Sequence, residues 1–142
     1  MDRNSPQGEL LESPRTVLLV EDDPQVRKWV HGQLERQGYN LLEACDGADA
    51  LVIAELHDGP IHILVTDVVM PRMHGPALVR GLLGFRPDVR VLFISGYPEP
   101  ILDGEEGFPS GSEYLQKPFQ TDKLLEKIEA LLQLSFPLQT NG

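Results

Sequence analysis

Short apolar runs alternate along this chain with longer segments in which apolar residues recur at helical spacing. The runs have the length and the β-branched and aliphatic content of buried strands, and they lie at about residues 16–20, 40–44, 61–67, 89–94 and 112–116. Helical periodicity follows the first, second, third and fifth runs. Strands and helices that alternate over short connections predict right-handed βαβ units, and therefore a parallel sheet with helices on both faces.

Individual residues mark where the helices begin and end. Asp23 is placed as the N-cap of the first helix, with Pro24 as its first residue, and Gly38 ends it. Asp46 is placed in the same way before the second helix. The residues predicted to face the core are Val26, Trp29, Val30, Leu34, Ala50, Leu51, Ala54, Leu78, Val79, Leu82, Leu83, Leu124, Leu125, Ile128, Leu131 and Leu132.

The segment from Ser95 to Gly111 departs from this alternation. Prolines, glycines and acidic residues interrupt helical periodicity there, so we expect the fourth helix to be short or irregular. Residues 1–14 are predicted to form a disordered lead-in or linker, residues 15–134 the folded domain and residues 135–142 a frayed tail. The predicted fold class is α/β, with a doubly wound, five-stranded parallel sheet.

Charge and composition exclude two kinds of partner. The chain has 12 basic and 22 acidic residues and a formal net charge of -10. A nucleic-acid backbone would be repelled by this excess, so a nucleic-acid partner is not expected. No apolar run approaches the roughly 20 residues of a membrane span, and the first residues lack the apolar core of a signal peptide. Direct membrane contact is therefore not expected either.

The single cysteine points to a reducing compartment, and hence to a cytoplasmic protein. Cys45 follows the second predicted strand, and we expect its side chain to be a small, buried apolar group. The four histidines stand in unrelated contexts, and surface or boundary positions are expected for all of them, namely His31, His57, His62 and His74.

Polar side chains follow three of the predicted strands at the point where each strand ends. The first strand runs into Glu21 and Asp22, and the third delivers Asp67 to its tip. Ser95 follows the fourth strand. In an open parallel sheet, ligands bind beyond the carboxyl ends of the strands, where the strand order reverses. If the order is 2-1-3-4-5, this point lies between the first and third strands, which carry the three acids.

Three carboxylates at one sheet edge need a compensating charge. Two carboxylates about 4 Å apart repel by roughly 4 kcal/mol at the dielectric of a protein surface, which favours protonation or a bound cation. Oxygen ligands in a site open to water, with no cluster of histidine or cysteine nearby, suit Mg²⁺ better than zinc. Mg²⁺ and Lys117 together would balance the three negative charges, and such a neutral site can accept a phosphoryl group.

Four motifs, in this order along the chain, resemble the receiver domains of two-component response regulators. They are VLLVEDDP at 17–24, TDVVMP at 66–71 with Gly75 beyond it, FISGY at 93–97 and YLQKPF at 114–119. One such motif is weak evidence, but four at the expected spacing are strong. The resemblance covers about residues 16–132. It implies a flavodoxin-like receiver fold with the strand order 2-1-3-4-5.

By that resemblance, Asp67 takes a phosphoryl group from the phosphohistidine of a histidine kinase or a histidine phosphotransfer domain and forms an acyl phosphate. Asp22, Asp67 and the carbonyl of Val69 bind Mg²⁺ directly, and Glu21 acts through water. The family is a signalling receiver rather than an enzyme in its own right, although it catalyses its own phosphotransfer and autodephosphorylation.

The resemblance also assigns the residues that bind the phosphoryl group and respond to it. Lys117 pairs with the phosphoryl oxygens, and the Ser95 hydroxyl hydrogen-bonds one of them. Ser95 and Tyr114 are the switch residues, because Ser95 moves toward the phosphate while Tyr114 turns inward. The bond between Lys117 and Pro118 is cis in such domains.

The pattern beyond the fourth strand is similar to that of receivers fused to hybrid sensor kinases. Tyr97 follows Ser95 two places on, and the glycine-rich stretch after it leads to the QKPF ending at 116–119. We therefore expect a free-standing receiver, a phosphorelay intermediate or part of a longer hybrid histidine kinase. The pattern leaves room for a weak homodimer.

Three alternatives remain for these residues. A receiver-like interaction module could keep the fold without phosphorylation and use its faces only for docking. A phosphotransfer hydrolase of the haloacid dehalogenase type would also use an aspartate nucleophile, but such enzymes carry a second acid two residues later, where this chain has Val69. Finally, Asp67 could cap a turn, Ser95 could begin one, and Tyr114 could be plain core.

Overall fold

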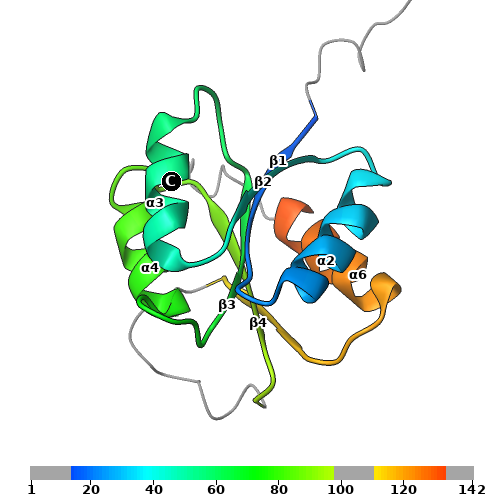
Figure 1. The fold of residues 1–142 in the computed structure, drawn as a ribbon. Helices are drawn as coiled ribbons and strands as arrows, with labels where there is room; N and C mark the ends of the chain where they lie inside the picture. Colours follow the sequence, from blue (N-terminus) through cyan, green and yellow to red (C-terminus); the bar gives the residue numbers. More distant parts are fainter. Residues whose placement is uncertain (1–13, 98–110, 134–142) are drawn as a thin grey trace, which may run out of the picture.

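The computed structural model describes residues 14–97 and 111–133 (Figure 1). Five parallel strands form one sheet in the order β2-β1-β3-β4-β5. The strands are β1 (Thr16–Val20), β2 (Asn40–Ala44), β3 (Ile63–Asp67), β4 (Arg90–Ser95) and β5 (Glu113–Gln116). The helices in the described part of the chain are α2 (Pro24–Glu35), α3 (Gly47–Leu56), α4 (Gly75–Leu83) and α6 (Thr121–Gln133). The predicted fold class and strand order are confirmed.

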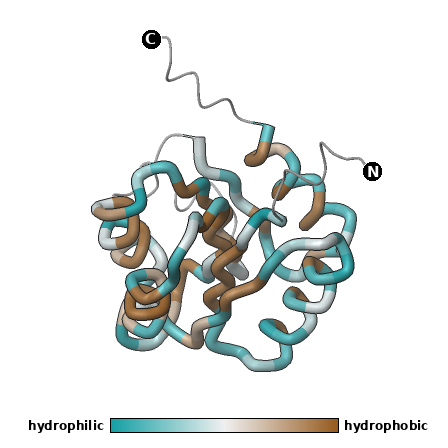
Figure 2. Tube along the Cα trace, turned by 90° about the horizontal axis from the view of Figure 1, so that it is seen from above, coloured by the Kyte–Doolittle hydropathy of each residue, from teal (hydrophilic) through white to brown (hydrophobic). Residues whose placement is uncertain are grey.

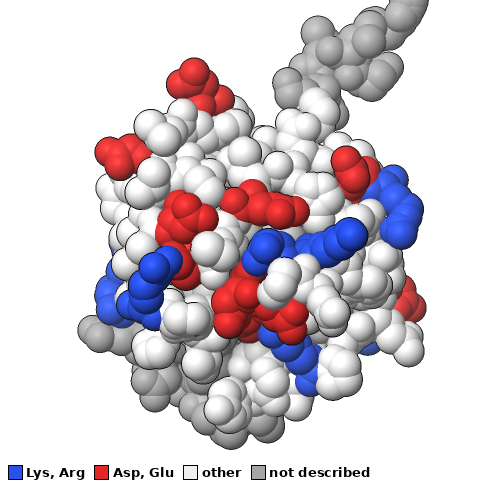
Figure 3. All heavy atoms as spheres, viewed as in Figure 1, with Lys and Arg blue, Asp and Glu red and all other residues white. Residues whose placement is uncertain are grey.

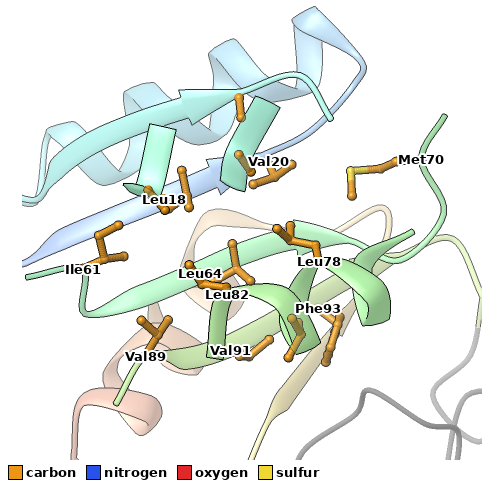
Figure 4. Close-up of a cluster of buried hydrophobic side chains, with 14 of the residues drawn as sticks. Leu18, Val20, Ile61, Leu64, Met70, Leu78, Leu82, Val89, Val91 and Phe93 are labelled. Carbon is orange, nitrogen blue, oxygen red and sulfur yellow. The ribbon is translucent and has the colours of Figure 1, made fainter. Parts of the chain in front are cut away.

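Helices cover both faces of the sheet, α3 and α4 on one and α2 and α6 on the other (Figure 1). Successive side chains of a strand point to opposite faces, so Leu18 packs into the core beneath α3 and α4 (Figure 4) while Leu19 packs into the core beneath α2 and α6. The central strands β1, β3 and β4 are therefore almost wholly buried, and their apolar residues form the hydrophobic centre of the molecule in Figure 2.

Both predicted helix caps are confirmed. The carboxylate of Asp23 accepts hydrogen bonds from the N–H groups of Gln25 and Val26 at the start of α2. The carboxylate of Asp46 accepts the N–H of Asp49 at 2.8 Å at the start of α3. Because a capping side chain satisfies N–H groups that have no partner within the helix, these two acids define where the chain turns from the sheet edge into each helix.

Two predicted positions are wrong. Trp29 on α2 is 40% exposed and lies at the edge of the core instead of inside it. Its ring centroid is 5.8 Å from that of Phe119. Cys45 is an exposed free thiol instead of a buried one. The physical reason for Cys45 is strand alternation, because Ala44 takes the buried position at the end of the edge strand and the next side chain points away.

The remaining core predictions agree with the structure, because each of these side chains is buried or half-buried. The four histidines are half-buried or exposed, as expected. The expected irregular fourth helix, the lead-in before residue 14 and the tail after residue 134 fall almost wholly outside the described residues. None of the helices in the described ranges is long and apolar enough to cross a membrane.

Candidate functional site

Three carboxylates converge at the carboxyl ends of β1 and β3. These strands are neighbours, and Val20 pairs with Thr66, so Glu21 and Asp67 leave the sheet side by side. Oxygen atoms of Glu21, Asp22 and Asp67 all lie within 4.8 Å of one another. Figure 3 shows a group of acidic side chains at the corresponding place, near where β1 leads into α2. Glu21 and Asp67 are buried, whereas Asp22 is exposed and keeps the site open to water.

Lys117 brings an ammonium group into this cluster from the end of β5. Its Nζ lies 3.1 Å from both carboxylate oxygens of Asp67 and 3.1 Å from Oε1 of Glu21. The main-chain N–H of Lys117 donates to the carbonyl of Ser95 at 2.7 Å, which ties this residue to the end of β4. The bond to Pro118 is cis, as the resemblance implied. The contact between Lys117 and Glu21 was not predicted.

One ammonium does not balance three carboxylates, and the protonation of Asp67 reflects this. Burial, the hydrogen bond to Glu21 and the charge of Glu21 raise the pKa of Asp67 to about 8, although Lys117 acts in the opposite direction. Burial alone would lower the pKa of Lys117, but the carboxylates of Asp67 and Glu21 outweigh it and raise that pKa. Lys117 therefore stays charged, and within residues 14–97 and 111–133 it is the only cationic side chain that pairs with Asp67.

The residues at this edge of the sheet fit a hard divalent cation. All the available donors are oxygen atoms, and no histidine or cysteine belongs to the acidic cluster. The charge of a cation would also oppose the burial and the Glu21 carboxylate that raise the pKa of Asp67. Val69 follows Asp67 by two residues and is exposed at the same end of the strand, so its carbonyl belongs to the same open edge.

Glu21 is oriented by two contacts that sequence reasoning missed. The main-chain N–H of Asp23 donates to its carboxylate at 3.0 Å, and the guanidinium of Arg27 donates to its carbonyl at 2.7 Å. Arg27 also lies 3.6 Å from the carboxylate of Glu43 on β2. No sequence signal marks Arg27, because its partners become neighbours only when α2 folds back along the sheet.

Ser95 and Tyr114 are joined through the main chain of Tyr97. The Ser95 hydroxyl, buried at the end of β4, accepts the N–H of Tyr97 at 3.1 Å. The Tyr114 hydroxyl donates to the carbonyl of the same residue. Tyr114 is 9% exposed, so its side chain lies inward. Ser95 is one residue beyond Ile94, which pairs with Asp67 across the sheet.

Gly75 allows the loop after Asp67 to close against the sheet. Its N–H donates to the carbonyl of Val68 at 2.8 Å. A Cβ atom at this position would stand 2.5 Å from the carbonyl oxygen of Asp67 and 3.1 Å from Cα of Val68. Since backbone atoms cannot give way as a flexible side chain can, only glycine lets α4 begin this close to Asp67.

Comparisons with known proteins agree with this geometry. The sequence pattern of the response regulator receiver domain matches residues 17–129. The sensor kinase CckA of Brucella abortus (strain 2308) is 38% identical over 123 residues, which make up 87% of this chain and 13% of CckA. The response regulator receiver protein CpdR of the same organism is 34% identical over 118 residues, 83% of this chain and 97% of CpdR.

A solved structure shows the same arrangement. The crystal structure of the receiver domain from the hybrid histidine kinase CckA matches with a TM-score of 0.71 at 37% identity, and the match covers 83% of this chain and 99% of that domain. The match to the family covers all four motifs in order, together with the sheet that carries them. The chain therefore belongs to the response regulator receiver domains of two-component signalling.

Proposed function

We propose that this receiver domain accepts a phosphoryl group from a phosphohistidine onto Asp67. The observation that carries the proposal is the position of the Lys117 ammonium, 3.1 Å from both oxygens of a buried carboxylate that has two further acids beside it. A structural aspartate without other acids beside it would be balanced by a single ammonium group. The surplus of negative charge leaves room for a cation and, with it, an incoming phosphoryl group.

In the proposed transfer, a carboxylate oxygen of Asp67 attacks the phosphorus of the phosphoimidazole. The new O–P bond forms as the P–N bond breaks, and the imidazole departs with the bonding electron pair and takes up a proton. Lys117 shifts hydrogen bonds from Asp67 to the phosphoryl oxygens and stabilises their charge. The Ser95 hydroxyl can donate to a phosphoryl oxygen while it still accepts the N–H of Tyr97, because a hydroxyl is both donor and acceptor.

Mg²⁺ is the cation that we assign to the acidic cluster. Asp22, Asp67 and the Val69 carbonyl would hold it directly, and Glu21 through water, since Glu21 is fully buried and already close to Lys117. When bound, Mg²⁺ supplies positive charge to the carboxylates and to the phosphoryl oxygens. Asp67 must be deprotonated to react at neutral pH, because only the carboxylate is a nucleophile.

A histidine kinase or a histidine phosphotransfer domain is the proposed phosphodonor, and the cytoplasm is the proposed compartment. The similarity to CckA and CpdR supports this class of partner. Next to the site, the exposed ring of Trp29 contacts the half-buried ring of Phe119, and Phe119 is two residues from Lys117. We propose that the donor domain contacts this pair, because aromatic side chains are enriched in protein interfaces and Trp is common among the residues that contribute most to binding.

The phosphoacceptor proposal is tested by incubating the chain with acetyl phosphate and Mg²⁺ and then measuring its intact mass. We expect a gain of one phosphoryl group that is lost in Asp67→Asn, without Mg²⁺, and after treatment with hydroxylamine, which cleaves acyl phosphates. Asp58→Asn is the matched control, since Asp58 is exposed and belongs to another loop, and it should be phosphorylated like the unchanged chain.

The same measurement separates this function from a non-phosphorylated interaction module. A module that uses its faces only for docking would show no mass gain with any phosphodonor, even though it has the same fold. A mass gain that persists in Asp67→Asn would place the modification elsewhere and would exclude Asp67 as the acceptor. Spontaneous loss of the group afterwards, with recovery of the starting mass, would show the proposed autodephosphorylation.

A further inference from the structure

Arg72 adopts a backbone conformation that its side chain disfavours. It lies in the loop between β3 and α4 with a φ angle of 70°, and it is the only residue other than glycine with a positive φ in the described ranges. An L-residue with a Cβ is strained there and stays only when its surroundings hold it. Its guanidinium forms an ion pair with the carboxylate of Asp46, which precedes α3. This ion pair fixes the side chain of Arg72, and the N–H of Met73 closes a turn around its backbone by donating to the carbonyl of Pro71 at 2.7 Å.

Asp46 connects this loop to the start of α3. Asp46 is 4% exposed, and its carboxylate also accepts the N–H of Asp49 as the helix cap. Next to it, Met73 lies against Gly47, where an added Cβ would come within 2.8 Å of Cβ and Cγ of Met73. The loop therefore rests on the first turn of α3 through one ion pair and one close packing contact.

The other side of the loop is fastened to the sheet. The N–H of Val68 donates to the carbonyl of Ile94 at 3.1 Å, and its carbonyl accepts the N–H of Gly75. Val68 and Met70 are buried, whereas Val69 between them is 54% exposed. Val69 thus lies between residues that are bonded to the sheet and residues that contact α3. Its own side chain is largely exposed.

We propose that the Arg72–Asp46 pair positions the loop that carries the Val69 carbonyl, and that Arg72 is therefore a positioning residue for the divalent cation. The inference rests on the proposed function, in which that carbonyl is a metal ligand. Groups that orient a ligand without touching the metal commonly change metal affinity when they are removed. Here the orienting group would reach the metal only through the backbone of residues 69–72.

The electrostatic effect of removing Arg72 has the opposite sign, which makes the inference testable. Loss of a positive charge from a chain with a net charge of -10 should strengthen the attraction for a divalent cation. Loss of a positioning contact should weaken binding. Weaker Mg²⁺ binding after removal of an arginine therefore cannot result from charge alone.

The experiment is a Mg²⁺ titration of the unphosphorylated chain, followed by the amide NMR shifts of residues at the ends of β1 and β3. Arg72→Asn is the test variant, because asparagine tolerates a positive φ and so removes the guanidinium without adding backbone strain. We expect its Kd for Mg²⁺ to rise about tenfold. Arg80→Asn is the matched control: Arg80 is exposed on α4, and its loss should leave the Kd unchanged or lower it.

A double-mutant cycle with Asp46→Asn assigns the effect to the pair. Asparagine is also a good N-cap, so α3 keeps its cap while the ion pair is lost, and Arg72→Asn should have no further effect on the Kd in this background. Thermal unfolding of each variant confirms that it is folded. Equal Kd values for Arg72→Asn and Arg80→Asn, or additive effects in the cycle, would overturn the inference. Absence of Mg²⁺ binding by the unchanged chain would instead overturn the proposed function.

Discussion

The hydroxyl of Tyr114 on β5 donates a hydrogen bond to the main-chain carbonyl of Tyr97, just beyond β4. The N–H of the same residue donates to the hydroxyl of Ser95. The peptide backbone at Tyr97 thus connects a buried aromatic side chain to the hydroxyl proposed to bind the phosphoryl group. A movement of Ser95 would reach Tyr114 through this backbone, without requiring contact between the two side chains.

Removal of the Tyr114 hydroxyl should weaken this connection. For Tyr114→Phe we expect a loss of about 1 kcal/mol in the free energy of unfolding, because the carbonyl of Tyr97 loses a partly buried hydrogen bond. We also expect smaller amide NMR shifts in β5 on phosphorylation. Tyr39→Phe is the control, since the Tyr39 hydroxyl has no hydrogen bond within the described residues; equal changes in both variants would refute the role given to Tyr114.

Val69 and Tyr97 should control how long the phosphoryl group survives. Both are bulky, largely apolar and about half exposed, 54% and 52%, beside Asp67 and Ser95. We expect them to hinder the water that attacks the acyl phosphate. Val69→Ser combined with Tyr97→Ser should shorten the half-life several-fold in a timed measurement of intact mass. An unchanged half-life would exclude this role, and Val52→Ser on α3 provides an exposed control.

Without metal, Asp67 should make folding stability depend on pH. Its pKa is raised from 3.8 to about 8 in the folded chain, so the folded state binds the proton more tightly than the unfolded state. The stability from this proton is complete below pH 3.8 and is lost as the pH rises through about 8. In EDTA, Asp67→Asn should therefore be more stable than the unchanged chain at pH 8 and show no such advantage near pH 4.

Urea unfolding at a series of pH values measures this difference directly. Mg²⁺ at ten times its Kd should stabilise the unchanged chain at pH 8 by about 1.4 kcal/mol, and it should stabilise Asp67→Asn much less. If the unfolding free energies of the two proteins stay parallel across the whole pH range, the raised pKa of Asp67 is wrong.

Gly75→Ala should disturb the site without removing any charged group. The new methyl would stand 2.5 Å from the carbonyl oxygen of Asp67, so the end of β3 or the start of α4 must move. We expect slower phosphorylation by acetyl phosphate and reduced stability. Gly32→Ala is the matched control, because nothing lies within 4 Å of its added Cβ on α2; it should gain about 0.5–1 kcal/mol in stability and be phosphorylated normally. Equal phosphorylation rates would contradict the role of Gly75.

Much of the fold could be predicted because its signals are local. The cap of α2 by Asp23 involves N–H groups only two and three residues away, and strand alternation places Leu18 and Leu19 on opposite faces. Interactions of this range depend on backbone geometry, which neighbouring residues largely determine. Trp29 shows the limit, since helical spacing predicted a core position and the presence of Phe119 beside it at the rim of α2 could not be foreseen.

For the site, the sequence by itself determined which groups stand at the ends of the strands: three acids, a serine and a lysine. Only the tertiary structure decided how they meet, with Lys117 between Glu21 and Asp67 and Arg72 paired with Asp46. The raised pKa of Asp67 follows from these contacts. Burial and the distances between charges set it, and both arise only when segments remote in the sequence are brought together by the packing of the sheet.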